Sequence, residues 1–156
     1  MLVAGEFVAS NLRKIVPPLK TALRATWFRT GWYSDDHAEL ERIYRTLKDP
    51  WNFETSQYEQ DRLNLLLEVI GRYPHTSILE VGCAEGLFTS MLRKLSQRVV
   101  AIDVSPTAIV RAKKRDPVST YLVASLDRFT ADERFDLVIC AETLYYMSDV
   151  AGALNK

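Results

Sequence analysis

The stretch ILEVGCAEGLFTS, residues 78–90, decides the fold of this chain. Its apolar beginning, interrupted by one acid, predicts a buried β-strand, and its second half has the apolar spacing of a helix. Between them, Gly82 and Gly86 bracket a turn, where glycine permits positive φ and lets a ligand approach the backbone closely. A strand, a glycine turn and a helix start in this order predict a ligand-binding turn at the carboxyl end of a strand.

Beyond this stretch, the chain alternates between predicted strands and predicted helices. Four strands are expected, at residues 77–81, 98–102, 120–124 and 135–141. Helices are expected at residues 87–95 and after Ser105, where Pro106 takes the first helical position. Strands that alternate with helices pair in parallel through right-handed crossovers. We therefore expect an α/β fold with a Rossmann-like, doubly wound, mostly parallel sheet.

The region before the first strand is predicted to be helical. Residues 6–30 have helically spaced apolar positions, interrupted by two prolines and mixed with basic residues. This pattern fits an arm packed on the domain or on a partner, and it also fits an amphipathic segment on a membrane surface. Two further helices are expected after Asp36 and Ser56, each of which has a glutamate three residues later, as in a capping box.

Composition excludes several classes of function. The chain has 156 residues, with 20 basic and 20 acidic side chains, so no net field favours nucleic acid. Its two cysteines have no spacing that indicates a zinc site or a disulfide framework, and no metal is expected. No apolar run is long enough to span a membrane, and a cytoplasmic location is expected. The oligomeric state is not predicted.

Two classes of nucleotide ligand compete for the glycine turn. The dinucleotide fingerprint G-x-G-x-x-G does not match the register of Gly82 and Gly86. Glu80 and Glu85 would also repel a pyrophosphate, since two like charges about 4 Å apart cost roughly 1–4 kcal/mol. The same acids would attract the sulfonium of S-adenosyl-L-methionine (SAM). Asp103, which ends the second strand, is suited to bind ribose hydroxyls, although it is also placed to cap the following helix.

Residues 80–86 resemble the first motif of class I SAM-dependent methyltransferases, acid-x-Gly-x-Gly-x-Gly, with Ala84 at the middle glycine. The resemblance implies SAM as cofactor and a seven-stranded sheet, of which this chain supplies four strands and ends soon after the fourth. The fourth strand would then be an apolar edge. The resemblance implies cofactor contacts at Glu80, Gly82, Cys83, Ala84, Gly86, Asp103, Val104, Ser125, Leu126, Ala141 and Glu142.

Residues 49–62, DPWNFETSQYEQDR, are similar to the N-terminal motif of the nodulation N-methyltransferase family, which acts on an amino sugar. In that family the segment is a lid over the cofactor, which implies contacts from Trp51, Tyr58 and Arg62. Tyr58 and Arg62 share a helix face, and an aromatic ring near a sulfonium contributes roughly 0.5–2 kcal/mol. Arg62 is suited to the carboxylate of the methionine moiety. Packing at the core edge is the alternative role of Trp51 and Tyr58.

These resemblances imply a helical extension at residues 1–48 and a SAM-binding domain at 49–156. The domain would comprise a lid at 49–73 and an incomplete Rossmann-like core at 77–156. The expected function is methyl transfer to a nitrogen or oxygen of a small-molecule acceptor, an amino sugar or related metabolite. The catalytic base is unknown, with Glu142, Tyr145 and Tyr146 as candidates. A non-catalytic SAM-binding or partner-docking module and a dinucleotide oxidoreductase are the alternatives.

Overall fold

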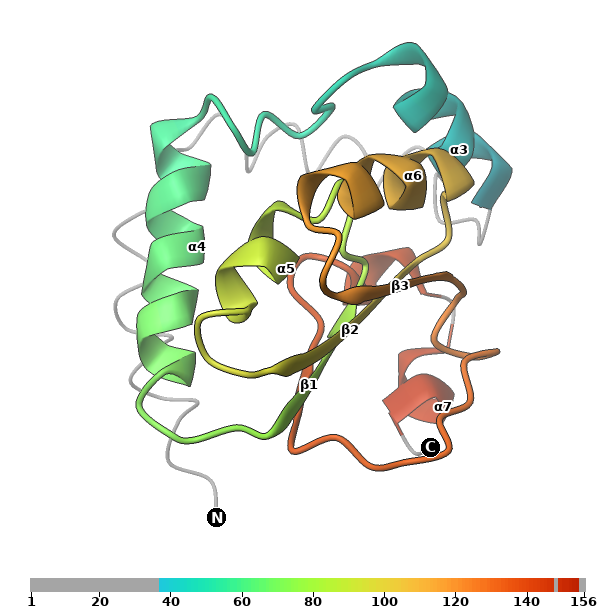
Figure 1. Cartoon of the computed structure of the whole chain (residues 1–156). Helices are drawn as coiled ribbons and strands as arrows, with labels where there is room; N and C mark the ends of the chain where they lie inside the picture. The colour runs from blue at the N-terminus through green and yellow to red at the C-terminus, as the bar shows by residue number, and fades with distance from the viewer. Residues whose placement is uncertain (1–36, 148, 155–156) are drawn as a thin grey trace. The chain divides into compact units, whose positions relative to one another are not determined.

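The computed structural model describes residues 37–147 and 149–154, all within one compact unit, residues 35–156 (Figure 1). The helices predicted within residues 6–30 lie outside the described residues. The predicted division between an extension and a domain at residue 48 stays a prediction.

Helices and strands alternate as the sequence predicts. Two helices precede the sheet, α3 (His37–Thr46) and α4 (Gln57–Ile70). The later elements are β1 (Ser77–Val81), α5 (Leu87–Leu92), β2 (Arg98–Asp103), α6 (Pro106–Arg115), β3 (Thr120–Val123), β4 (Leu137–Ile139), the 3-10 helix η1 (Leu144–Tyr146) and α7 (Val150–Leu154).

Three elements are shorter than predicted, and β3 lacks only the last predicted residue, Ala124. The helix α5 ends at Leu92 rather than Leu95, because Lys94 and Leu95 donate their N–H groups three residues back, to Met91 and Leu92. Such bonds tighten the last turn of a helix. The strand β4 covers three residues of the predicted 135–141, because it pairs along one side only, with residues 78–80 of β1.

The four strands form one parallel sheet in the order β3-β2-β1-β4. The chain moves outward from β1 to β2 and β3, and then returns to pair β4 with the other side of β1. The strand order therefore reverses between β1 and β4, and ligands of such sheets bind beyond the carboxyl ends at this switch point. As predicted, β4 is an edge, and the Val138 side chain is 50% exposed.

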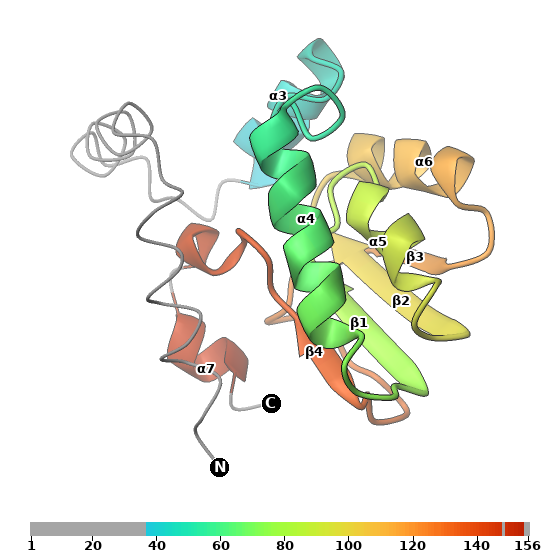
Figure 2. The same cartoon turned by 90° about the vertical axis from the view of Figure 1, so that its left-hand side faces the viewer.

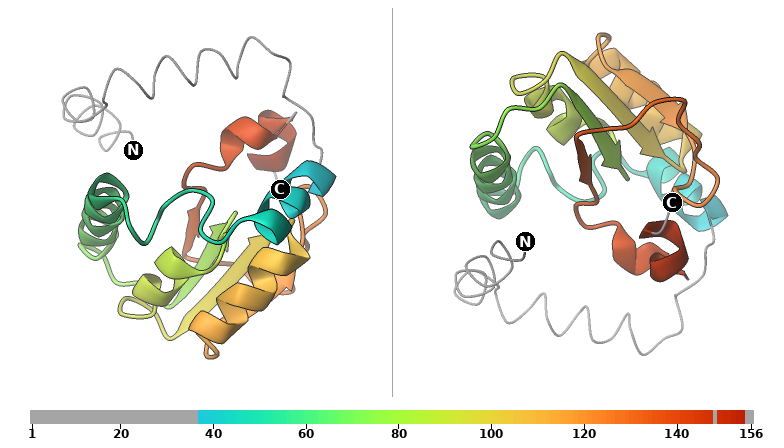
Figure 3. Two further views of the ribbon diagram at one scale, coloured as in Figure 1. Left: turned by 90° about the horizontal axis from the view of Figure 1, so that it is seen from above. Right: turned by 90° about the horizontal axis from the view of Figure 1, so that it is seen from below.

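Helices α5 and α6 cover one side of the sheet, and α7 lies on the opposite side (Figures 2 and 3). A buried cluster joins α4 and α5 to the sheet through Leu63, Phe88 and Leu92. The opposite face of β1 and β2 packs against loop residues, among them Phe129 and Phe135. Both central strands are buried from both sides, which explains their nearly continuous apolar sequence.

The helices before the sheet begin where the sequence predicts. The Ser56 hydroxyl accepts a hydrogen bond from the Glu59 N–H at 3.4 Å, and the helix that it caps ends at Gly71. In α3, Tyr44 is buried, whereas Leu47 lies past the end of the helix and is 51% exposed. No described helix has the length and apolar character needed to cross a bilayer.

Candidate ligand site at the glycine turn

The glycine turn has three residues with positive φ. Gly82 and Gly86 have φ of +74° and +76°, and Ala84, at the position of the middle glycine, has φ of +49°. A side chain in this left-handed region costs roughly 1–2 kcal/mol, so Ala84 retains a strained conformation. The N–H groups of Gly82 and Cys83 both donate to the Ile102 carbonyl, at 2.8 and 3.0 Å, which fixes the turn to the end of β2.

The Asp103 carboxylate ties this turn to the start of α6. One oxygen accepts the Ala84 N–H and the other accepts the Ser105 N–H, both at 2.9 Å. Burial raises the pKa of Asp103, although these N–H donors favour the charged form. Ser105 itself caps α6, because its hydroxyl accepts the Ala108 N–H at 3.0 Å. The predicted alternative, in which Asp103 is the helix cap, is therefore wrong.

Two acidic or thiol side chains at this end of β1 are buried, that of Glu80 in the strand and that of Cys83 in the turn. The Glu80 carboxylate accepts the Thr89 hydroxyl at 2.5 Å beneath α5, and its burial raises its pKa to about 7. The Cys83 side chain packs in the core against Ile109 and Ala112 of α6, and burial raises the pKa of its thiol. Both side chains are therefore buried, and their predicted contacts with a cofactor stay predictions.

Glu85 does not add free negative charge to the site. Its carboxylate forms an ion pair with Arg111 of α6. The charge on which the sequence argument relies is therefore paired with a neighbouring guanidinium, which weakens its effect on a ligand, and a direct role of Glu85 stays a prediction. No signal in the sequence identified this pairing, since the two residues lie 26 positions apart.

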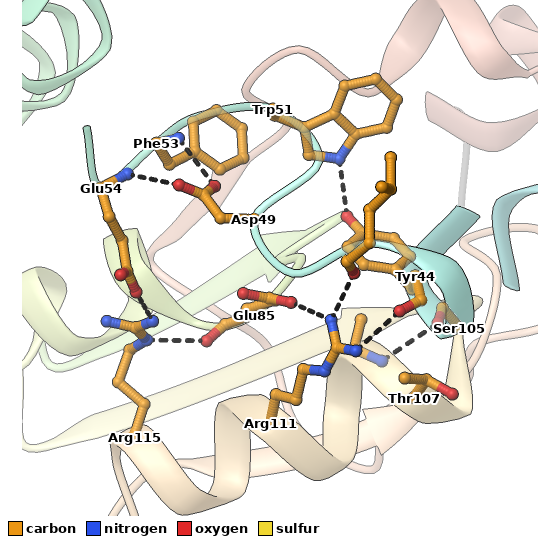
Figure 4. Close-up of polar contacts among 12 residues, drawn as sticks. Tyr44, Asp49, Trp51, Phe53, Glu54, Glu85, Ser105, Thr107, Arg111 and Arg115 are labelled. Atoms are coloured by element: carbon orange, nitrogen blue, oxygen red, sulfur yellow. Dashed lines mark hydrogen bonds and ion pairs between the residues drawn. The ribbon is translucent and has the colours of Figure 1, made fainter. Parts of the chain in front are cut away.

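The predicted lid lies against the turn. The Trp51 indole N–H donates to the Tyr44 hydroxyl at 2.9 Å (Figure 4). Tyr44 is buried together with Ala84 of the turn and Ala108 of α6, and Trp51 packs against this cluster. The Trp51 ring also lies 6.5 Å from the ring of Tyr146, measured between centroids. The predicted lid segment thus contacts, through Trp51, both the glycine turn and the segment that follows β4.

The other two lid residues lie on α4. Arg62 donates from Nε to Glu59 at 3.0 Å, and this ion pair is largely buried. Tyr58 is half-buried on the same helix. Their predicted contacts with a cofactor stay predictions, because the described contact of Arg62 is within α4.

Ser125 follows β3 at the same end of the sheet as Asp103. The preceding residue, Ala124, donates its N–H to the Asp103 carbonyl at 3.0 Å. The Ser125 hydroxyl oxygen is buried, and among the described residues no group forms a hydrogen bond with it. Of its predicted neighbours, Val104 is half-buried beside Asp103, and Leu126 packs on the opposite face of the sheet. A buried hydroxyl without a partner fits a polar group of a ligand.

The segment after β4 closes the other side of the site. Ala141 packs against the core, and Glu142 is exposed with φ of +60°, a strained value for this residue type. The ring centroids of Tyr145 and Tyr146 lie 4.5 Å apart, with the ring planes tilted by 46°. Partial burial, with Tyr146 and Glu142 nearby, raises the pKa of Tyr145, whose side chain is still partly exposed, so its phenol is neutral near pH 7. Sequence reasoning did not identify Thr143, which contacts the turn directly.

A parallel sheet with a glycine turn after β1 and an acid at the end of β2, beside the switch point, defines the class I methyltransferase fold. The chain belongs to the nodulation protein S (NodS) family, which matches residues 33–155. Membership of this family excludes the dinucleotide oxidoreductase alternative.

Relatives and a solved structure agree with this assignment. The chain is 40% identical to nodulation protein S of Sinorhizobium fredii, over 67% of this chain and 50% of the relative. It is also 40% identical to nodulation protein S of Bradyrhizobium diazoefficiens, over 74% of this chain and 57% of the relative. The crystal structure of N-methyltransferase NodS from Bradyrhizobium japonicum WM9, in complex with S-adenosyl-L-homocysteine (SAH), is 31% identical, with a TM-score of 0.67 over 77% of this chain and 63% of that one. The chain thus spans about half the length of the two nodulation S proteins named first.

Proposed function

We propose that this chain forms the cofactor-binding part of a methyltransferase that transfers a methyl group from SAM to a nitrogen or oxygen of a small molecule. The observation that carries the proposal is the position of Asp103. Its carboxylate, at the end of β2, is bonded to the Ala84 N–H of the glycine turn at 2.9 Å. Asp103, a hydrogen-bond acceptor for ribose hydroxyls, therefore lies beside the glycine turn, whose backbone a ligand can approach closely. Both are next to the switch point.

The residues present fit an adenosyl group. Asp103 would accept hydrogen bonds from the ribose hydroxyls through its remaining lone pairs. The Ser125 hydroxyl, which has no hydrogen-bond partner among the described residues, would receive a polar group at the adenine, with Val104 and Leu126 beside it. The backbone of residues 82–86 and the Ala141–Glu142 segment would hold the methionine moiety.

The lid would complete the cofactor site. Trp51 is held by Tyr44 over the buried cluster that includes Ala84, so its ring is available to a sulfonium in the turn. Tyr58 and Arg62 are proposed as further contacts from α4. Arg62 would exchange part of its interaction with Glu59 for the carboxylate of the methionine moiety.

The cofactor, when bound, supplies a methyl group attached to a positively charged sulfur. That sulfur is already a good leaving group. The protein then has to position the acceptor, exclude water and, for a protonated acceptor, remove a proton. Tyr145, a neutral phenol, is a poor base, so Glu142 is the better candidate at the mouth of the site. Tyr146, which contacts Trp51, would form the wall of the pocket.

The finer proposal is that the acceptor is an amino sugar or related metabolite and that the protein acts in the cytoplasm. Support for the acceptor comes from family membership, since the similar solved protein is described as an N-methyltransferase. The aromatic rings and the carboxylate after β4 suit a polar, cationic small molecule. Support for the location comes from composition alone.

A non-catalytic SAM-binding or partner-docking module is the second candidate. It is favoured by the position of β4 at the edge of the sheet. The apolar edge strand β4, with Val138 half-exposed, would then be available for pairing with another chain. Transfer of a methyl group from SAM to an amino-sugar acceptor separates the two candidates, because only the enzyme carries it out.

Calorimetric titration with SAH tests the cofactor site. We expect the wild-type chain to bind SAH in preference to NAD, and Asp103→Asn to weaken SAH binding. Asp116→Asn is a matched control, because Asp116 is also buried but accepts hydrogen bonds from Val118 and Ser119 at the far end of α6. Circular dichroism verifies that each variant is folded. A folded wild-type chain without affinity for SAH would contradict the proposal.

A further inference from the structure

Arg111 of α6 connects the glycine turn to the end of α3. Its Nη2 donates to the Tyr44 carbonyl at 2.7 Å, and its Nη1 donates to the Leu47 carbonyl at 2.8 Å (Figure 4). The same Nη1 forms the ion pair with Glu85. One planar guanidinium therefore binds the turn and the segment that leads into the lid at the same time.

These contacts satisfy groups that have no partner within a helix. The last carbonyls of an α-helix lack intrahelical N–H donors, and α3 ends at Thr46. A cation near them also interacts favourably with the helix dipole. The side chains of Arg111 and Glu85 are 28% and 14% exposed, so solvent screens their interaction less than that of a surface pair.

Arg115, one helical turn further along α6, adds a second connection. Its Nε donates to the Glu85 carbonyl at 3.0 Å, and its Nη2 forms an ion pair with Glu54. Both arginines thus bind Glu85, and both have a further partner between residues 44 and 54. Asp49 shapes the segment between these partners, because its carboxylate accepts the N–H groups of Phe53 and Glu54 at 2.8 and 2.9 Å.

We propose that Arg111, assisted by Arg115, is a positioning residue for the cofactor site. By fixing the Tyr44 backbone and the Glu85 side chain, it holds the Tyr44–Trp51 pair closed over the glycine turn before a ligand arrives. A site ordered in advance binds more tightly, because the ordering cost is not subtracted from the binding free energy. The consequence for affinity rests on the function proposed above, whereas the closure of the segment does not.

Two measurements on the same variants test this role. Calorimetry with SAH reports affinity, and hydrogen exchange without ligand reports the order within residues 49–56 that closure against the turn maintains, since their N–H groups bond to acceptors inside this segment. The N–H groups of Asn52, Phe53, Glu54 and Ser56 are hydrogen-bonded in the closed segment, and β1 is the internal reference. The variants are Arg111→Met, Arg111→Lys and, as a matched control on α3, Arg42→Met. Arg42 is 68% exposed and pairs with Glu39 of its own helix.

We expect Arg111→Met to raise the Kd for SAH about tenfold or more, which is about 1.4 kcal/mol. Exchange of residues 49–56 should become faster, whereas β1 should exchange at the wild-type rate. Arg111→Lys, which keeps the charge but loses the fork, should restore part of both properties, and Arg42→Met should change neither. A purely structural role would lower the melting temperature and speed exchange in β1 without a selective effect on the segment.

The two proposals fail in different ways. If the wild-type chain does not bind SAH, the proposed function fails, and the exchange measurement still tests the closure. If the wild-type chain binds SAH but Arg111→Met binds it equally well, the positioning role is overturned. Unchanged exchange of residues 49–56 in a folded Arg111→Met chain also overturns it.

Discussion

The Thr143 side chain fills the space beside Gly82, across the switch point between β1 and β4. Its hydroxyl donates to the Val81 carbonyl at 3.0 Å. A Cβ atom at Gly82 would lie 2.1 Å from the Thr143 hydroxyl oxygen, well inside contact distance. Because Gly82 also has φ of +74°, two independent constraints require glycine at this position.

Gly82→Ala should therefore destabilise the fold by about 2 kcal/mol or more, from the left-handed backbone and the clash together. Adding Thr143→Ala removes the two nearest atoms and should recover part of this loss, leaving the backbone cost. Urea unfolding of the single and double variants measures both effects. Gly71→Ala, at a glycine with φ of −66°, is the control and should cost less. If the double variant is as unstable as the sum of the single variants, the clash is not the cause.

Glu80 should make stability depend on pH. Burial raises its pKa from 4.5 to about 7, with Asp103 adding to the rise and the Thr89 hydroxyl opposing it. The folded state thus holds a proton that the unfolded state releases, so this contribution to stability is complete below pH 4.5 and is lost as the pH rises through about 7. The loss is on the order of 3 kcal/mol.

The Glu80→Gln variant isolates this effect, because glutamine keeps an acceptor for the Thr89 hydroxyl and does not titrate. Relative to wild type, its free energy of unfolding should rise between pH 5 and pH 8. Equal pH profiles for the two proteins in urea unfolding would show that Glu80 is charged in the folded state at neutral pH.

Tyr44 and Trp51 should be coupled energetically. Tyr44→Phe removes the acceptor of the Trp51 indole N–H, and we expect it to cost roughly 0.5–1.5 kcal/mol of stability and to weaken SAH binding. A double-mutant cycle with Trp51→Phe measures the coupling by urea unfolding. Since the two side chains share one hydrogen bond and an edge-to-face ring contact, the double variant should lose less than the sum of the single variants. Strict additivity would contradict this.

Glu41 of α3 should stabilise the start of α6. Its carboxylate accepts the Ser105 and Thr107 hydroxyls, both at 2.6 Å, and the Thr107 N–H at 3.1 Å. We expect Glu41→Ala to cost about 1–3 kcal/mol in urea unfolding, because it leaves these donors without their acceptor. Glu39→Ala, which removes an exposed ion pair on the same helix, should cost much less.

The same measurement has a defined pH dependence. Burial alone would raise the pKa of Glu41, but the hydrogen bonds from Ser105 and Thr107 outweigh it and lower the pKa. The contribution of Glu41 is therefore present above the ordinary glutamate pKa and is lost as the pH falls through the lower, folded value. The difference between wild type and Glu41→Ala should narrow in acid, and a constant difference would contradict this.

The local sequence determined the order of the elements and the place of the glycine turn. Residues 77–81 form a strand because they are apolar enough to be buried on both faces, and Ser56 and Ser105 start helices because their hydroxyls accept backbone N–H groups. The position of Asp103 after the second strand followed from the same reading. Each of these features depends on neighbours within a few positions in the chain.

Only the tertiary structure decided which side chains face the site. The sequence predicts that Glu80 and Glu85 are both charges beside a ligand, yet one is buried under α5 and the other pairs with Arg111. Thr143 reaches Gly82 from 61 positions away because β4 returns to pair with β1. Local pattern cannot specify such contacts, since the crossovers of a parallel sheet bring together residues that are far apart in sequence.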